Sequence, residues 1–240
     1  MKLINVAGEA INYKSYGKGK PFVMLHGFGG NHNDWDEIAR EYANEGYETI
    51  IPNFTSLYLS PGREITFSQQ VHLLRSLLEV FADEKGKVTL AGASYGGALS
   101  WAVAIAAPDL VEKIVLVNPM PPHPRKRFKD PILKIFISLA KYPAILAGFI
   151  LSPAGRMMLP HLERLFRFAY LEDNAKKRNI AHMTERKLKV ILHVVQRFLW
   201  ICDQENWAFW ESRLGNMETP TQLIWGDQDK LFDRSVYLRL

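Results

Sequence analysis

The sequence predicts an α/β fold, with a mostly parallel sheet and helices on both of its faces. Over the first 120 residues, short apolar runs alternate with segments whose apolar residues recur at helical spacing. Apolar runs without polar alternation are typical of strands buried on both faces. A glycine-rich turn, Gly92–Gly96, ends one of these strands and begins a helix. Strands that alternate with helices indicate a parallel sheet covered on both sides.

The chain begins with strand patterns. Leu3–Val6 and Ala10–Tyr13 are predicted to form two strands joined by a turn at Gly8 and Glu9. Phe22–Leu25 follows as a continuous apolar run, which predicts a strand buried on both faces. A helix is then predicted over residues 34–45, with one apolar face made by Trp35, Ile38, Ala39 and Tyr42.

The next elements keep this alternation. Thr66 with Gln69 three residues later forms a capping box, which predicts the start of a helix that runs through Phe81. Three further strands are predicted at Thr49–Ile51, Val88–Ala91 and Ile114–Val117. The last two flank the glycine-rich turn and its helix.

The alternation stops at the proline-rich segment Asn118–Pro122. Helical patterns alone follow, until a strand is predicted again at Pro220–Trp225. We therefore expect residues 1–120 to form the first part of an α/β core and residues 121–217 to form a helical cap inserted into it. Residues 218–240 are expected to form the second part of the core.

Charge is uneven along the 240 residues, whose net charge is +5. Residues 121–217 carry 17 Lys and Arg against 8 Asp and Glu, and the remainder carries 13 against 17. No nucleic-acid motif accompanies the basic region, so we expect no nucleic-acid partner. A solvated helical face and an anionic lipid surface are both compatible with it.

The composition favours an ordinary globular chain in a reducing compartment. Cys202 is the single cysteine, which excludes an intramolecular disulfide and a cysteine-based metal site. The N-terminus carries no apolar stretch typical of a signal peptide. We expect a cytoplasmic protein, with association at a membrane as the alternative. The apolar residues 132–151 approach the length of a membrane span, but two lysines and a proline favour a cap helix or a lid.

The turn around Ser94 has the pattern Gly-x-Ser-x-Gly between a strand and a helix, which is that of a nucleophile elbow. A serine nucleophile needs donors for the oxyanion, a base, and an acid to orient that base. The glycine-rich loop His26–Gly30 follows a buried strand, where its backbone N–H groups can face a developing charge. Asp229 or Asp227, in the turn after the last strand, is the candidate acid.

These motifs together resemble the α/β-hydrolase family, in the form with a helical cap inserted after the sixth strand. The resemblance implies Ser94 as the nucleophile and Asp229 as the acid of the triad. It also implies main-chain N–H donors at Phe28 and Tyr95 for the oxyanion. Haloalkane dehalogenases and epoxide hydrolases resemble this chain too, but they place an aspartate where this chain has Ser94.

The sequence departs from the family pattern in two places. Residues 52–57 lack the Asp- and Gly-rich turn that usually follows the fourth strand. More importantly, the family's histidine base follows the acid, and no histidine follows Asp229. We therefore expect a chain truncated at the C-terminus, without the final strand and helix of the fold. Among the seven histidines His123 is the one that could reach the site, and His26 is expected to be structural.

We therefore predict a serine hydrolase of the carboxylesterase or lipase type, acting on an apolar acyl ester through an acyl-enzyme. The alternative is a catalytically inactive binding protein or fragment of the same fold, without the histidine. Thioesterases, peptidases and carbon–carbon bond hydrolases use the same groups, so they stay open. The expected partner is a small apolar ester, with peripheral membrane contact through the basic, apolar cap as a further possibility. No cofactor and no metal is expected.

Overall fold

The computed structural model describes residues 1–54, 57, 64–82, 86–131, 185–229 and 231–238, together with scattered positions between 134 and 157. Their compact parts divide into two units. The core unit contains residues 1–122, 204–225 and 234–240, and the cap unit contains residues 123–203 and 226–233. Each unit is described separately below.

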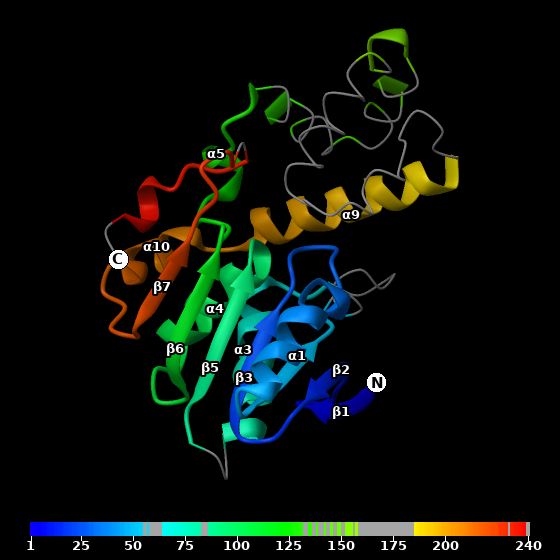
Figure 1. The fold of residues 1–240 in the computed structure, drawn as a ribbon. Coiled ribbons are helices and arrows are strands. Elements are labelled where there is room, and N and C mark those ends of the chain that lie inside the picture. Colours follow the sequence, from blue (N-terminus) through cyan, green and yellow to red (C-terminus); the bar gives the residue numbers. More distant parts are fainter. Residues whose placement is uncertain are drawn as a thin grey trace. The chain divides into compact units, whose positions relative to one another are not determined.

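A seven-stranded sheet forms the centre of the core unit, in the order β1-β2-β4-β3-β5-β6-β7 (Figure 1). The pairs β1–β2 and β2–β4 are antiparallel, and the pairs from β4 through β3, β5 and β6 to β7 are parallel. The predicted mostly parallel sheet is thus confirmed. Its strands are β1 (Lys2–Val6), β2 (Glu9–Tyr16), β3 (Lys20–Leu25), β4 (Tyr47–Pro52), β5 (Val88–Ala93), β6 (Val111–Val117) and β7 (Thr221–Ile224).

Helices cover both faces of this sheet. Helix α1 (Asp36–Asn44) lies on one face, while α3 (Phe67–Ala82) and α4 (Tyr95–Ala106) lie on the other (Figure 1). The capping box predicted for α3 is present: Thr66 N donates to Gln69 Oε1 at 2.8 Å, and Gln69 N donates to Thr66 Oγ1 at 3.2 Å. Every residue of α4 from Tyr95 to Ala104 is buried, which explains its largely apolar sequence.

The first helix differs from its prediction. A 3-10 turn, η1 (His32–Trp35), precedes α1, because Asn31 caps it and Asp34 Oδ2 accepts from Asn31 N in return. The helical face is also narrower than expected. Trp35 and Ala39 are buried, whereas Ile38 and Tyr42 are each 42% exposed.

Among the described residues, the α-helices assigned after β6 are α5 (Pro124–Arg127), α9 (Glu185–Gln204) and α10 (Trp207–Leu214). The sequence places residues 121–217 in the cap, whereas α10 belongs to the core unit and packs on α4. Residues 226–233, expected in the core, fall in the cap unit instead. Most of the apolar stretch 132–151 and all of residues 158–184 lie outside the described residues. Within the described part of the chain, no helix combines the length and apolarity that a membrane span requires.

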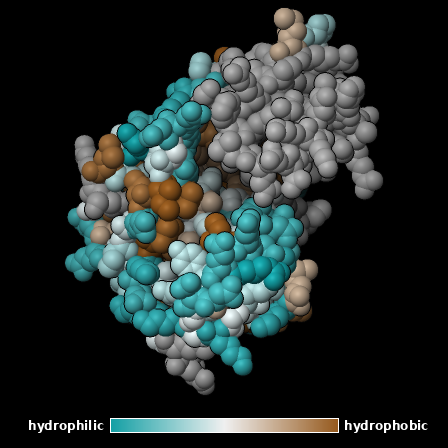
Figure 2. Space-filling model, in the orientation of Figure 1, coloured by the Kyte–Doolittle hydropathy of each residue, from teal (hydrophilic) through white to brown (hydrophobic). Residues whose placement is uncertain are grey.

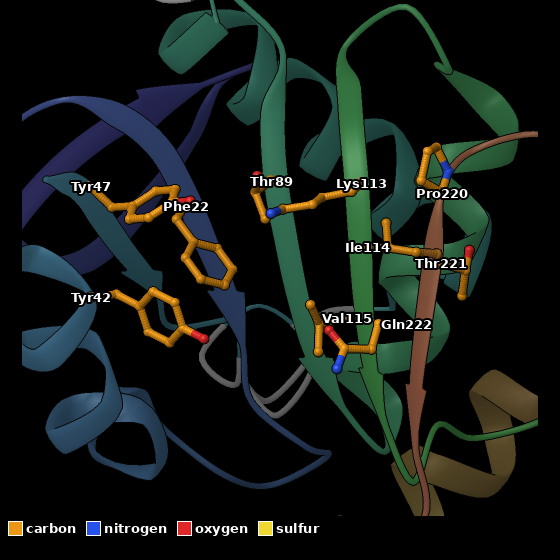
Figure 3. Close-up of a pocket in the computed structure, with 10 residues that line it drawn as sticks. All are labelled: Phe22, Tyr42, Tyr47, Thr89, Lys113, Ile114, Val115, Pro220, Thr221 and Gln222. Atoms are coloured by element: carbon orange, nitrogen blue, oxygen red, sulfur yellow. The ribbon is translucent and has the colours of Figure 1, made fainter. Parts of the chain in front are cut away.

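The sheet face beside α1 is open over β5, β6 and β7. Val115 and Val117 of β6 are half-buried there, Ile224 of β7 is 47% exposed, and Figure 2 shows apolar surface over these strands. A hollow of about 260 Å³ lies toward the amino ends of β5 and β6. Figure 3 shows aromatic rings on one side of it and Lys113 reaching across toward Thr89. Because Ser94 follows the carboxyl end of β5, this hollow is separate from the candidate site.

Candidate active site

Ser94 occupies the single residue between β5 and α4, and its backbone is strained. Its φ is +50° and its ψ is −112°, a region that non-glycine residues rarely adopt. Ser94 N donates to Val117 O at 3.0 Å, and Ser94 O accepts from Ala98 N at 3.0 Å and from Met120 N at 2.8 Å. Three backbone hydrogen bonds therefore hold the residue in this conformation. This is the geometry that the Gly-x-Ser-x-Gly pattern predicts.

The glycines around Ser94 are required by close backbone approach. A Cβ on Gly92 would lie 2.3 Å from Gly96 O, and one on Gly96 would lie 2.3 Å from Leu25 O. A Cβ on Gly97 would lie 2.8 Å from the side chain of Pro119. The start of α4 is thus packed directly on the end of β3 and on the segment after β6.

The loop Gly27–Gly30 lies beside Ser94. A Cβ on Gly27 would lie 3.6 Å from Ser94 Cβ, and the loop closes with a hydrogen bond from Gly30 N to Gly27 O at 3.0 Å. The Phe28 ring meets the Tyr95 ring edge to face, with 5.1 Å between centroids. The structure therefore brings together Ser94 and the two residues expected to supply oxyanion donors, Phe28 and Tyr95.

His26 is held by the backbone on both sides of its ring. Nδ1 lies 2.8 Å from Gly27 O, and Nε2 lies 3.3 Å from Phe54 N. A carbonyl can only accept and an amide N–H can only donate, so the ring is the neutral tautomer with its proton on Nδ1. Burial lowers the pKa of His26 below its ordinary value, which keeps the ring neutral. His26 is therefore structural, as expected, and has no free nitrogen to act as a base.

A charged cluster that sequence reasoning missed fixes the segment after the oxyanion loop. Asp36 Oδ1 accepts from Lys14 Nζ at 2.7 Å and from Tyr16 Oη at 2.6 Å. These bonds lower the pKa of Asp36 to about 2, and burial with the bond to Asp36 raises the pKa of Tyr16. Alternating polar residues on β2 carry no signal that points to a partner on α1.

The contacts of Met120 are a second feature of the site that the sequence analysis did not predict. Its carbonyl accepts from Tyr237 Oη at 2.7 Å and from Trp101 Nε1 at 3.4 Å, while its N–H donates to Ser94 O. The segment after β6 is thereby fixed to the elbow. The proline-rich run around Met120 was the available signal, because such runs have a limited set of backbone conformations.

Asp229 belongs to the cap unit. Its Oδ1 accepts from Leu231 N at 2.7 Å and Phe232 N at 3.3 Å, and Lys129 Nζ donates to its carbonyl at 3.1 Å. Asp229 is half-buried, and Asp227 is exposed. The role of Asp229 as the acid of a triad stays a prediction.

The remaining histidines occupy varied positions. His123 lies in the cap unit, at the N-terminus of α5 and with φ +51°. His72 is exposed on α3, and His161 and His182 lie outside the described residues. Nowhere in the described ranges do three His, Cys, Asp or Glu side chains group in a way that could hold a metal ion.

Comparison with known proteins identifies relatives of this chain. It is 30% identical over 131 residues to the AB hydrolase superfamily protein YfhM of Bacillus subtilis, a match that covers 52% of this chain and 45% of that protein. It is 32% identical over 117 residues to Lipase 1 of Psychrobacter immobilis, which covers 47% of this chain and 36% of the lipase. The matches thus span less than half the length of each of these two relatives.

The fold is shared with solved structures at lower identity. A bacterial membrane phospholipase A matches 99% of this chain and 73% of its own, with a TM-score of 0.63 and 18% identity. The family model for the alpha/beta hydrolase fold matches residues 20–240. The chain therefore belongs to the alpha/beta hydrolase fold family.

Proposed function

We propose that the protein is a serine hydrolase that cleaves an apolar acyl ester through an acyl-enzyme intermediate, as carboxylesterases and lipases do. The observation that carries the proposal is the strained backbone of Ser94, with φ +50° between β5 and α4. Strain of this kind costs about 1–3 kcal/mol and persists where the surroundings enforce it, which is typical of functional residues. A serine at the elbow supports acyl transfer, since the hydroxyl can carry the acyl group.

The expected reaction has two halves. Ser94 Oγ attacks the ester carbonyl carbon while a base takes its proton, and the carbonyl oxygen becomes an oxyanion. The main-chain N–H groups of Phe28 and Tyr95 donate to that oxygen. Collapse expels the alcohol, which takes the proton from the base and leaves the acyl group on Ser94. Water activated by the same base then releases the carboxylic acid.

The proposed reaction also needs a base that takes the proton of Ser94. His26 is excluded because both of its ring nitrogens are engaged by backbone groups. No histidine follows Asp229 in the sequence. We propose that Asp229 orients the histidine that acts as the base, with His123 as the candidate within this chain.

The substrate class rests on the apolar character of the cap. Its described part presents exposed apolar side chains, together with the basic residues of α5. These features support an apolar acyl group, and they support peripheral contact with an anionic lipid surface. The exposed apolar side chains are Ile135, Tyr142, Ile145 and Met157.

Labelling with a fluorophosphonate probe tests the nucleophile. We expect the 240-residue chain to label slowly, with added imidazole as an external base speeding the reaction. Ser94→Ala should abolish labelling, whereas Ser212→Ala, which removes an exposed hydroxyl from α10, should leave it unchanged. Labelling that persists in Ser94→Ala would refute the assignment of the nucleophile.

Turnover of a short-chain p-nitrophenyl ester tests the base. Without a base, comparable triads retain an enhancement of about 10³–10⁴ over water. We expect this residual rate from the chain alone. Turnover of about 1–10³ per second, ordinary for an enzyme, would instead show that one of its own histidines acts. His123→Ala would then be the first variant to measure.

A catalytically inactive binding protein of the same fold is the second candidate. The observation that favours it is that backbone groups engage both ring nitrogens of His26, the histidine of the loop beside Ser94. This function predicts no Ser94-dependent labelling even with imidazole present. The imidazole experiment therefore separates the two candidates.

A further inference from the structure

We propose that Tyr237 is a positioning residue for the oxyanion site, and that it acts through Met120 to fix the direction of the main-chain N–H of Tyr95. The inference rests on the proposed function, because it takes the Tyr95 N–H as an oxyanion donor. Tyr237 follows Met120 by 117 residues and lies outside the motifs around Ser94 and Asp229.

The direction of the Tyr95 N–H depends on the backbone torsion ψ of Ser94. The Ser94 C=O and the Tyr95 N–H belong to one planar trans peptide, so they point in opposite directions. Rotation about ψ turns this whole peptide relative to the Cα that carries the Ser94 hydroxyl. The pair φ +50° and ψ −112° lies outside the usual regions, so surrounding contacts are needed to hold it. A fixed Ser94 carbonyl therefore fixes the geometry between the proposed nucleophile and its donor.

Two N–H groups hold the Ser94 carbonyl, and one of them comes from outside α4. Ala98 N donates at 3.0 Å as the first bond of the helix, and Met120 N donates at 2.8 Å from the segment after β6. Proline has no N–H, so Met120 supplies the single main-chain donor of residues 119–122. The bond from Met120 thus fixes the Ser94–Tyr95 peptide to the end of β6.

Met120 is itself held through its carbonyl. Tyr237 Oη donates to Met120 O at 2.7 Å, and Trp101 Nε1 donates to it at 3.4 Å. The second bond is longer than the range of about 2.7–3.2 Å that is usual for N–H donors. Met120 and Tyr237 are both buried. Loss of the Tyr237 hydroxyl would therefore leave a buried carbonyl with the long bond from Trp101 alone.

The ring of Tyr237 is fixed independently of its hydroxyl. Tyr237 ends the 3-10 turn η4 (Ser235–Tyr237), and its N–H donates to Arg234 O at 2.9 Å. Its ring lies against the ring of Trp225, with 6.0 Å between centroids. Tyr237→Phe keeps these contacts and removes the hydroxyl, so the variant tests the bond to Met120 separately from the packing of η4.

NMR on the ¹³C,¹⁵N-labelled 240-residue chain tests the proposal without requiring turnover. In the unchanged protein, a scalar coupling across the hydrogen bond should connect Met120 N with the carbonyl carbon of Ser94. In Tyr237→Phe, the residual dipolar coupling of the Tyr95 N–H should change, while those of the last turn of α4 stay the same. The Met120 amide should exchange at least about tenfold faster relative to the amides of β5.

Thr49→Val is the matched control, because it removes another buried hydroxyl that donates to a main-chain carbonyl. Thr49 Oγ1 donates to Ala39 O at 3.1 Å and joins β4 to α1, and β3 and β5 separate β4 from β6. This variant should lower the urea midpoint of unfolding but leave the Tyr95 coupling and the relative exchange of Met120 unchanged. Equal changes in Thr49→Val and Tyr237→Phe would overturn the proposal, and so would a missing scalar coupling in the unchanged protein.

Phosphonylation of Ser94 connects this geometry to the proposed reaction. The phosphonyl oxygen of the adduct takes the place of the oxyanion, so the Tyr95 amide proton should move downfield as it donates to that oxygen. With imidazole present, Tyr237→Phe should label at least about threefold more slowly, which is less than the factor of about 10²–10³ for loss of a whole donor. The downfield shift should also be smaller in Tyr237→Phe. Thr49→Val should match the unchanged protein in both measurements.

The two sets of measurements separate the positioning role from the proposed function. If Tyr237→Phe labels as fast as the unchanged protein, the direction of the Tyr95 N–H does not matter for the reaction and the proposal is overturned. If Ser94 labels in no variant, the proposed function falls. The dipolar couplings and amide exchange of the unmodified chain then still decide whether Tyr237 holds the Tyr95 N–H.

Discussion

At the scale of single residues, the candidate site depends on the strained backbone of Ser94 and on neighbouring glycines that have no room for a side chain. Ser94 keeps a positive φ because β6, α4 and the segment after β6 all form hydrogen bonds with its backbone. The sequence predicted this residue, because a tight turn from strand to helix requires small neighbours on both sides of the serine. It did not predict Met120, because the hydrogen bond from Met120 N to Ser94 O joins residues with no shared local pattern.

Gly96 gives the first prediction at this scale. A Cβ there would lie 2.3 Å from Leu25 O and 2.6 Å from His26 O. Both are backbone atoms, which can shift only at a high cost in free energy. Gly96→Ala should therefore lower the free energy of unfolding by about 2–3 kcal/mol, as overpacking does. Urea unfolding followed by tryptophan fluorescence measures this change.

Gly215 provides the matched control for Gly96. It has φ −70°, and a Cβ built on it meets no atom within 4 Å. Gly215→Ala should change the free energy of unfolding by no more than about 0.5 kcal/mol. An equal loss in the two variants would show that the approach of β3 to α4 is not what requires a glycine.

At the scale of elements, polar contacts between distant segments place the helices. Glu205, between α9 and α10, accepts from Ser68 N, Ser68 Oγ and Trp210 Nε1 at 2.8–3.0 Å. A carboxylate from 137 residues away thus bonds the first turn of α3 and completes the capping that Thr66 and Gln69 begin. The sequence predicted the local capping box, because its two residues are three apart, but no periodicity could reveal Glu205.

Asp36 gives the prediction at the element scale, because it joins α1 to β2. Its pKa is about 2 in the folded protein, against an ordinary value of 3.8, so the unfolded chain binds more protons between these values. The stabilisation is complete above pH 3.8 and is lost as the pH falls toward 2. Asp36→Asn should lower the free energy of unfolding at pH 7 by about 1–2 kcal/mol. The variant should also not show the loss of stability that protonation of Asp36 causes as the pH falls from 3.8 toward 2.

Glu37 is the control for Asp36, since it lies exposed in the same first turn of α1. Urea unfolding between pH 2 and 7 should give Glu37→Gln a profile parallel to that of the unchanged protein. A profile for Asp36→Asn that also runs parallel would mean that the bonds from Lys14 and Tyr16 do not depend on the charge of Asp36.

At the scale of the whole molecule, the alternation of patterns predicted the parallel sheet but not the division of the chain. The sequence could not show that α10 belongs to the core, because an apolar helix face has the same pattern whichever unit it packs against. The rings of Trp207 and Trp210 pack on Phe67 of the core, and these contacts place α10 in the core unit. The cap unit likewise gains residues 226–233, because Phe128 and Phe232 stack with 4.7 Å between centroids.

The open edge of the sheet gives the last prediction. Among the described strands, β7 lies at the end of the sheet and pairs on one side with β6, beside the half-buried Val115 and Val117. Unpaired edge strands next to apolar surface promote association between copies, and a lysine on the edge opposes it. Ile224, 47% exposed on β7, is the position where a lysine should act most directly.

Light scattering after size-exclusion chromatography measures this effect over a range of concentrations. We expect the unchanged protein to associate as its concentration rises, and Ile224→Lys to stay monomeric to higher concentration. Val80→Lys adds the same charge at a 53% exposed position on α3, away from the sheet edge, and should associate as the unchanged protein does. If both variants reduce association equally, net charge accounts for the effect, because only a change on β7 can block strand pairing there.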